Sequence, residues 1–185
     1  FISIDKKRVI TSTEALSLSE IPKKLLVIGG GVIGLEIGQV YKRLGAEVAV
    51  IEFMPKIIPG MDAMLSKELQ KSLKKQGIKF FTSHKVTSVE NTGDSVTVTA
   101  DDKKGNPVTF EGDYCLISVG RRPYTDKLGL ENAGVKMTER GQIETNDHLQ
   151  ANIPDIYAIG DVIKGAMLAH KAEEEGTMAA EIIAG

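Results

Sequence analysis

One short segment, Gly29-Gly30-Gly31-Val32-Ile33-Gly34, restricts the possible folds of this chain more than any other. It has the pattern G-x-G-x-x-G and follows an apolar run, LLVIG, of the kind that is buried on both faces in a parallel sheet. Apolar residues then recur at helical spacing, and a second apolar run, VAVIE, ends at Glu52. Strand, helix and strand within about 30 residues predict a βαβ unit.

Two helices are expected around this unit. The first covers residues 32–44 and is closed by Gly45, and the second covers about 62–76 and is closed by Gly77. The spacing predicts that both helices turn apolar side chains inward. These are Ile33, Ile37, Val40, Tyr41 and Leu44 on the first helix, and Leu65, Leu69 and Leu73 on the second.

The rest of the chain alternates between strands and loops. Short strands separated by turns over residues 79–110 predict a β-meander packed on the α/β sheet. Buried strands are expected at 114–119 and 155–160, and a last helix at about 168–183. Together these elements predict an α/β fold: a Rossmann-like three-layer domain with a parallel sheet and a β-meander.

The glycines have separate expected roles in binding a dinucleotide. Gly29 permits a tight turn off the strand, and Gly31 leaves room for a pyrophosphate against the backbone. Gly34, with Gly38 one turn later, lets the helix lie close to the strands. The unpaired N–H groups and the dipole of the helix start then attract the phosphates. The alternative is a glycine-rich turn without a ligand, which the accompanying strand, helix and acidic residue disfavour.

Glu52 stands about 20 residues beyond the glycines, where a carboxylate can accept both hydroxyls of the adenosine ribose. It would repel a 2′-phosphate by roughly 4 kcal/mol at about 4 Å and an effective dielectric constant of 20. The next residues, Phe53, Met54 and Pro55, include no arginine to receive that phosphate. NAD or NADH is therefore expected in preference to the phosphorylated forms. The alternative is a strand-end acid without a ligand.

Composition and charge exclude several other classes. The net charge of −2 offers no general attraction for nucleic acid or an anionic membrane, and no segment is apolar for long enough to span a membrane. The single cysteine, Cys115, is expected to be an inert core residue and gives no sign of an oxidising compartment, so a cytoplasmic location is expected. His84 and His148 have no partners at metal-binding spacing, and no metal site is expected.

Four strings, VIGGGVIGLEIG, SVGRRPYT, IYAIGDV and MLAHKAEEEG, in this order and spacing resemble the dihydrolipoamide dehydrogenase family of flavoprotein disulfide reductases. The resemblance covers essentially the whole chain. It implies a parent enzyme that oxidises dihydrolipoamide through a redox-active disulfide, passes electrons to FAD and reduces NAD. It also implies a homodimer that joins 2-oxo acid dehydrogenase complexes through their lipoyl domains.

The resemblance also implies cofactor-binding residues. The pyrophosphate loop and helix start correspond to Gly29, Gly30, Gly31, Val32, Ile33, Gly34, Leu35 and Glu36. Glu52 matches the ribose ligand, while Val86 and Gly120 match further nucleotide contacts. Asp161 matches an acid that binds the ribityl chain of the flavin, and a flavin-lining segment corresponds to Met167, Leu168, Ala169 and His170. Glu36 is expected at the nicotinamide end as a steering group.

The chain departs from the family pattern in ways that limit its expected activity. It has one cysteine instead of a C-x-x-x-x-C pair, and it has neither the first flavin glycine loop nor the catalytic His-Glu pair of the family. We therefore expect no catalytic residue here and read the chain as a central fragment. Residues 1–21 would be a tail of the FAD-binding domain, 22–145 the NAD-binding domain, and 146–185 a returning FAD-binding segment.

Several alternatives stay open at this level. Asp161 can serve as a helix cap, and Arg121 and Arg122 can pair with surface carboxylates as readily as bind nucleotide. His170 is expected to be packed or solvent-facing rather than a proton carrier. The parent can instead be another disulfide reductase or a transhydrogenase, and the chain can be a non-catalytic NAD-binding module.

Overall fold

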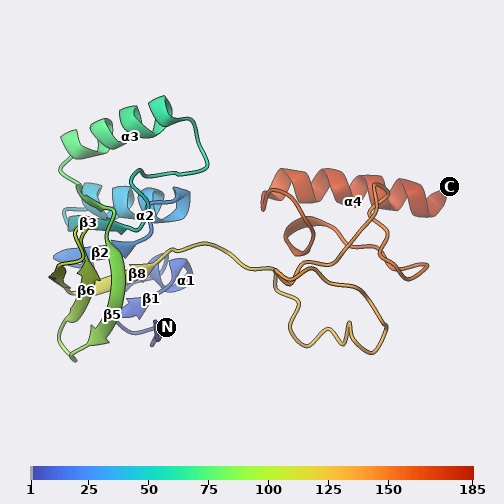
Figure 1. Ribbon diagram of the computed structural model, residues 1–185, viewed down its shortest axis with the longest axis horizontal. Helices are drawn as coiled ribbons and strands as arrows, with labels where there is room; N and C mark the ends of the chain where they lie inside the picture. Colours follow the sequence, from blue (N-terminus) through green and yellow to red (C-terminus); the bar gives the residue numbers. More distant parts are fainter. Residues whose placement is uncertain (1) are drawn as a thin grey trace. The chain divides into compact units, whose positions relative to one another are not determined.

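The chain divides into two structural units, and the first ends at Gly120. A five-stranded parallel sheet forms the centre of this first unit (Figure 1). The structure is a computed structural model that describes residues 2–185, so Phe1 lies outside the described part. The strand order is β1-β8-β2-β3-β4, and every neighbouring pair is parallel. The strands are β1 (Val9–Ile10), β2 (Lys24–Ile28), β3 (Glu47–Glu52), β4 (Lys79–Thr82) and β8 (Tyr114–Ile117).

Helices cover one face of this sheet. They are α1 (Ser12–Ala15), α2 (Val32–Arg43) and α3 (Ala63–Lys75). Alternate strand residues, such as Leu25 and Val27 of β2, pack into one core with side chains from the helices. The next residues along β2, Leu26 and Ile28, point to the opposite face. Both faces are therefore apolar, which explains the uninterrupted apolar runs in the sequence.

A three-stranded antiparallel sheet covers the other face. It consists of β5 (Lys85–Asn91), β6 (Val96–Asp101) and β7 (Pro107–Gly112) in that order. Its inward residues, Val96, Val98 and Phe110 among them, form a second core with Leu26 and Ile51 of the parallel sheet. The prediction of a three-layer α/β fold with a parallel sheet and a β-meander is confirmed.

Helix ends fall where the glycines predict them. Gly45, with φ +107°, follows α2, and the Ala46 N–H donates to the Tyr41 carbonyl. Gly77, with φ +91°, follows α3 in the same way. A left-handed residue after the last helical turn is the usual way for a chain to leave a helix.

The inward faces of the helices match the predicted ones only in part: Tyr41 and Leu73 are buried as expected. On α2, Val40 and Leu44 are exposed, and Leu35 is buried together with the glycines of the same face. Because glycine carries no side chain, the helix approaches the strands along its glycine face, and a pattern of large apolar residues cannot reveal that orientation. On α3, Leu65 and Leu69 are exposed, and the inward line passes through Ser66 and Leu73. The Ser66 hydroxyl donates to the Ile57 carbonyl, which fixes this rotation.

Two strand predictions are wrong in detail. Residues 79–82, assigned to the meander, form β4 and pair with β3 in the parallel sheet. Residues 155–160, predicted as a buried strand, have a single backbone bridge, between Gln150 and Tyr157, among the described residues. A strand needs a neighbour that continues the hydrogen-bond ladder, and one bridge does not supply it.

The second unit covers Arg121–Gly185. It contains a short 3-10 turn, η1 (Gly160–Val162), and the helix α4 (Ala169–Ala184), as predicted for the end of the chain. Isolated bridges and turns connect the loops over residues 121–168. Its small core consists of Val135, Ile143, Leu149, Ala151, Ala158, Ile163 and Ala179.

These units do not coincide with the three predicted domains. Residues 2–21 lie in the first unit, where β1 pairs with β8, and residues 121–145 lie in the second. The assignment of residues to NAD-binding and FAD-binding domains stays a prediction. Among residues 2–185, no helix has the length and apolar character needed to cross a membrane.

We predict that Gly34→Ala destabilises the protein. A Cβ atom at this position would lie 2.4 Å from the Ser118 Oγ and 2.5 Å from the Gly29 carbonyl oxygen. We expect the free energy of unfolding to fall by about 1–3 kcal/mol, although alanine is intrinsically the better helix former. Urea denaturation followed by circular dichroism measures this. Gly60→Ala is the control, because its Cβ would meet nothing within 4 Å. Unchanged stability of Gly34→Ala would contradict the close packing.

Candidate functional site

The turn between β2 and α2 is held tightly against β8. Gly29 has φ +105°, and a Cβ atom there would lie 2.4 Å from the Ser118 carbonyl oxygen. Its N–H donates to the Ile51 carbonyl of β3 over 2.9 Å. The Ser118 hydroxyl also donates to the Ile28 carbonyl. Only glycine meets both the backbone angle and the space, as expected for the tight turn, and the part of Gly29 in nucleotide binding stays a prediction.

Gly31 stands in contrast to its neighbours. Its φ is −78°, so the backbone does not require glycine, and a Cβ atom there would meet nothing within 4 Å. At Gly34, one turn later, an added Cβ atom would lie 3.0 Å from Val27 Cγ1 and closer still to Ser118. Neither conformation nor packing within the described residues explains a glycine at position 31. The open space is what a ligand lying against the backbone requires.

The start of α2 has no side-chain cap. Gly31 is its N-cap residue and has no side chain to accept a hydrogen bond. By contrast, Thr11 and Glu14 form a capping box on α1, and Asp62 accepts from the Met64 N–H at the start of α3. The first N–H groups of a helix normally need acceptors. Those of α2 are available to an anion, which the helix dipole also favours.

Glu52 is directly connected to this turn. Its side chain is buried, with 7% of the residue exposed. Oε2 accepts from the Gly30 N–H, and Oε1 accepts from the Met54 N–H over 2.6 Å. An ionised carboxylate has about four lone-pair positions, so each oxygen keeps one more acceptor position. The two oxygens can therefore accept two neighbouring hydroxyl groups while they still brace the turn.

The chain beyond Glu52 contains features that the sequence did not single out. Phe53 is 66% exposed, an unusual position for a large aromatic ring beside a buried acid. Lys56 is a cation four residues from Glu52, but its ammonium donates to the Met61 carbonyl over 2.9 Å. The His84 N–H donates to the Glu52 carbonyl and so ties the start of β5 to the end of β3. A positive charge close to an acid in sequence is the signal that could have identified Lys56.

The other predicted nucleotide-binding residues are distributed unevenly. Val32 and Glu36 are exposed one turn apart on α2, and Ile33 is partly buried. Leu35 is 5% exposed and packs into the core, so its side chain faces away from any ligand on that surface. Val86 lies on β5 and packs against the second core. Gly120, with φ +121° and open space around its Cβ position, follows β8.

The second unit holds the residues predicted to line a flavin. Asp161 lies in η1 and forms an ion pair with Arg121, with 3.3 Å between its Oδ2 and the Arg121 Nη2. Pairing with a carboxylate, one of the two roles left open for Arg121, is thus observed. The segment leading into α4 is mostly exposed: Met167 is partly buried, and Leu168, Ala169 and His170 are exposed.

The sulfur and metal chemistry of the described residues is limited. Cys115 lies in β8 with no exposed surface, and burial raises the pKa of its thiol to about 12. It is the inert core residue that the sequence predicts. Among residues 2–185, no three His, Cys, Asp or Glu side chains gather in a way that could hold a metal ion.

Curated proteins resemble the chain over its whole length. Mitochondrial dihydrolipoyl dehydrogenase 1 of Arabidopsis thaliana is 51% identical over 100% of this chain and 36% of its own length. The mitochondrial dihydrolipoyl dehydrogenase of Caenorhabditis elegans is 50% identical over 100% of this chain and 38% of its own length. The chain therefore spans little more than a third of the length of these relatives.

Solved structures share the fold. LpdA from Mycobacterium tuberculosis is 30% identical with a TM-score of 0.88, over 98% of this chain and 39% of its own. The HOCl-induced flavoprotein disulfide reductase RclA from Escherichia coli is 26% identical with a TM-score of 0.90, over 99% of this chain and 41% of its own.

The names of the curated relatives correct one expectation. The relatives from Arabidopsis thaliana, Caenorhabditis elegans and Pisum sativum are all named mitochondrial, which contradicts the expected cytoplasmic location. That expectation rested on a single cysteine, which shows only that the residues of this chain form no disulfide with one another and does not distinguish between compartments.

A family model described as pyridine nucleotide-disulphide oxidoreductase matches residues 2–176. The match includes the glycine turn, the buried Glu52 and the η1 turn with Asp161, so that both units contribute to it. On the combined grounds of fold, site and similarity, this chain belongs to the pyridine nucleotide-disulphide oxidoreductase family.

Proposed function

We propose that this chain is the NAD-binding part of a dihydrolipoamide dehydrogenase and that it also contributes one side of the flavin site. The observation that carries the proposal is the hydrogen bond from the Gly30 N–H to the buried Glu52 carboxylate. The bond holds a buried acid, which could accept the hydroxyls of a ribose, beside an open, uncapped helix start. Relatives named dihydrolipoyl dehydrogenase at about 50% identity support the choice of reaction.

In the whole protein, the proposed reaction removes two electrons and two protons from the dithiol of dihydrolipoamide. The dithiol closes to a disulfide, NAD⁺ gains a hydride, and one proton goes to solvent. When bound, FAD and NAD supply the electron-transfer chemistry. The residues of this chain orient the dinucleotide: the α2 N-terminus binds the pyrophosphate, Glu52 binds the ribose, and Glu36 lies toward the nicotinamide end.

The chain itself supplies no sulfur chemistry in this proposal. A redox-active disulfide needs two cysteines, and the one cysteine of these 185 residues is buried, with a thiol pKa of about 12. The disulfide and the acid–base residues would therefore come from other parts of the whole protein. We further propose that the whole protein is a homodimer and that it joins 2-oxo acid dehydrogenase complexes.

We predict that the chain binds NADH at least about tenfold more tightly than NADPH, which corresponds to 1.4 kcal/mol. The charge of Glu52 repels a 2′-phosphate, and the Lys56 ammonium is held by the Met61 carbonyl. An engineered NADPH oxidase of the same fold agrees with this logic: it binds NADPH and carries an aspartate-to-alanine replacement followed by an alanine-to-arginine replacement. Calorimetric titration of both nucleotides measures the ratio.

Two variants give this experiment its controls. Glu52→Gln should bring the ratio of the two affinities toward one. Glu47→Gln should leave it unchanged, because Glu47 lies at the other end of β3 and pairs on the surface with Lys79. Equal affinity of the unaltered chain for NADH and NADPH would refute the role of Glu52.

We also predict that Gly31→Val abolishes NADH binding and preserves the fold. The valine would occupy the open space beside the helix start, and the φ of −78° at position 31 suits a β-branched residue. Fluorescence titration with NADH and circular dichroism measure the two effects. Gly60→Val is the matched control, since it adds the same side chain at another open position. A folded Gly31→Val variant that still binds NADH would show that the pyrophosphate lies elsewhere.

For the flavin site, we predict that the chain alone is colourless even after it is mixed with FAD. Leu168, Ala169 and His170 are exposed, and an open half-site buries too little cofactor surface to offset the entropy of association. In the full-length protein, Asp161→Ala should weaken FAD binding by about 1.5–3 kcal/mol. Asp147→Ala, which changes an exposed acid of the same unit, should not. Absorption in the flavin bands tests both statements, and a yellow chain would contradict the first.

A further inference from the structure

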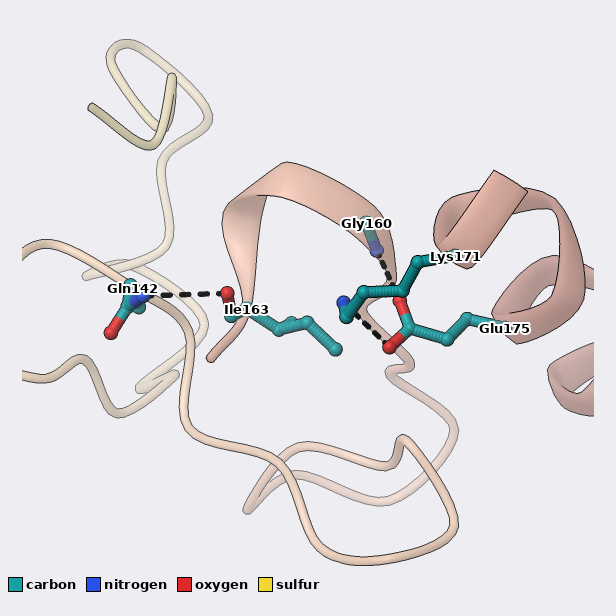
Figure 2. A network of polar contacts seen from close by, with 5 residues as sticks. All are labelled: Gln142, Gly160, Ile163, Lys171 and Glu175. Carbon is teal, nitrogen blue, oxygen red and sulfur yellow. Dashed lines mark hydrogen bonds and ion pairs between the residues drawn. The ribbon is translucent and has the colours of Figure 1, made fainter. Parts of the chain in front are cut away.

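One pair of charged side chains on α4, Glu175 and Lys171, lies beside two turns of the second unit, at Gly160 and at Gly165. Figure 2 shows the pair and its bond to Gly160. Both glycines have positive φ, +71° and +133°. Gly160 immediately precedes Asp161, and Gly165 precedes the segment that begins at Met167. These are the two stretches assigned above to the flavin site.

Glu175 holds the first turn. Its Oε2 accepts from the Gly160 N–H over 2.8 Å, and its Oε1 lies 2.6 Å from the ammonium of Lys171, one helical turn earlier. Burial on its own would raise the pKa of this carboxyl group. The contacts with Lys171 and Gly160 outweigh that effect and lower the pKa below its usual value. The group is therefore a charged acceptor for the Gly160 N–H at neutral pH.

Lys171 reaches the second turn. Its side chain is 22% exposed, and a Cβ atom at Gly165 would lie 2.7 Å from its Cε. The same region of α4 touches the first turn, because a Cβ at Gly160 would lie 3.0 Å from the Ala172 Cβ. Both turns therefore need glycine for its backbone angle, and the Gly160 turn also needs it for its small size. The two glutamates immediately before Glu175 on α4, Glu173 and Glu174, are exposed.

The side-chain contact of Asp161 itself is too weak to fix its position. Its ion pair with Arg121 joins side chains that are 38% and 60% exposed, and such surface pairs contribute little. At the far end of the turn, the Ile143 N–H donates to the Val162 carbonyl over 2.8 Å, and the Ile163 N–H donates to the Gly160 carbonyl over 3.4 Å. The Gln142 amide donates to the Ile163 carbonyl, also over 3.4 Å (Figure 2). The beginning of the turn, directly before Asp161, is held by the half-buried, charge-assisted bond from the Gly160 N–H to Glu175.

We propose that Glu175, oriented by Lys171, is a positioning residue that holds the η1 turn so that Asp161 faces a flavin. This inference rests on the flavin role of Asp161 in the proposed function. Glu175 would not touch the cofactor, and it would act through the backbone of Gly160. Its effect on flavin binding should therefore disappear once Asp161 has been removed.

The test uses the full-length protein that contains this chain and measures two quantities. Hydrogen exchange of the peptide with Gly160, in the cofactor-stripped protein, reports whether the turn is held. Flavin fluorescence gives the FAD dissociation constant. Glu175→Ala should speed exchange at Gly160 and weaken FAD binding, each by about tenfold. Glu175→Gln keeps a carbonyl oxygen for the Gly160 N–H and should recover most of both effects.

The matched control and the double variant separate positioning from general damage. Glu174→Ala removes an adjacent, exposed glutamate and should match the unaltered protein in both measurements. The double variant Asp161→Ala with Glu175→Ala should bind FAD no more weakly than Asp161→Ala alone, because one residue acts through the other. Additive losses would overturn the inference, as would unchanged exchange at Gly160 in Glu175→Ala.

Failure of the proposed function gives a different result. If Asp161→Ala binds FAD as tightly as the unaltered protein, the flavin role of Asp161 is wrong and the positioning role falls with it, whatever the exchange at Gly160. If Asp161→Ala weakens FAD binding and Glu175→Ala speeds exchange without any loss of FAD affinity, the proposed function stands. In that case Glu175 only stabilises the turn.

Discussion

The close packing of the start of α2 against β2 and against Ser118, the residue that follows β8, is the constraint on which the rest of the first unit depends. Gly29 and Gly34 remove the side chains that would otherwise separate the helix from the strands, and Ser118 lies within 2.4 Å of the Cβ position of Gly34. The helix can then begin immediately after the turn, with its N-terminus beside the end of β3. Because Gly29 and Gly34 have no Cβ atom, the uncapped start of α2 lies beside Glu52, the buried acid at the end of β3.

Within that geometry, Glu52 has a structural and a proposed binding role. It accepts from the N–H groups of Gly30 and Met54, and each carboxylate oxygen keeps a lone pair that can accept from a ligand. The site is preformed, since no side chain has to leave the helix start before an anion enters. A preformed site loses little conformational entropy on binding. The second unit follows a similar principle at Gly160, where a backbone turn is braced by a charged side chain.

Much of the first unit could be predicted because its signals are local. Gly29, Gly34 and Glu52 stand at distances in sequence that a strand, a turn and a helix fix by their own geometry. The inward face of α2 could not be predicted from its apolar residues, because the contact surface is the glycine face and Val40 and Leu44 are left exposed. For α3, a hydrogen bond from Ser66 sets the rotation, and hydrophobic spacing carries no information about it. Residues 79–82 and 155–160 were misassigned because strand pairing depends on distant partners.

A crystal structure of the chain with NADH would show directly where the dinucleotide binds. We predict the pyrophosphate at the N-terminus of α2, within hydrogen-bond distance of the N–H groups there and against Gly31. We also predict that both hydroxyls of the adenosine ribose bind to the free lone pairs of Glu52, which keeps its bond to Gly30. A dinucleotide bound elsewhere on the surface, or a ribose that makes no contact with Glu52, would contradict this binding mode.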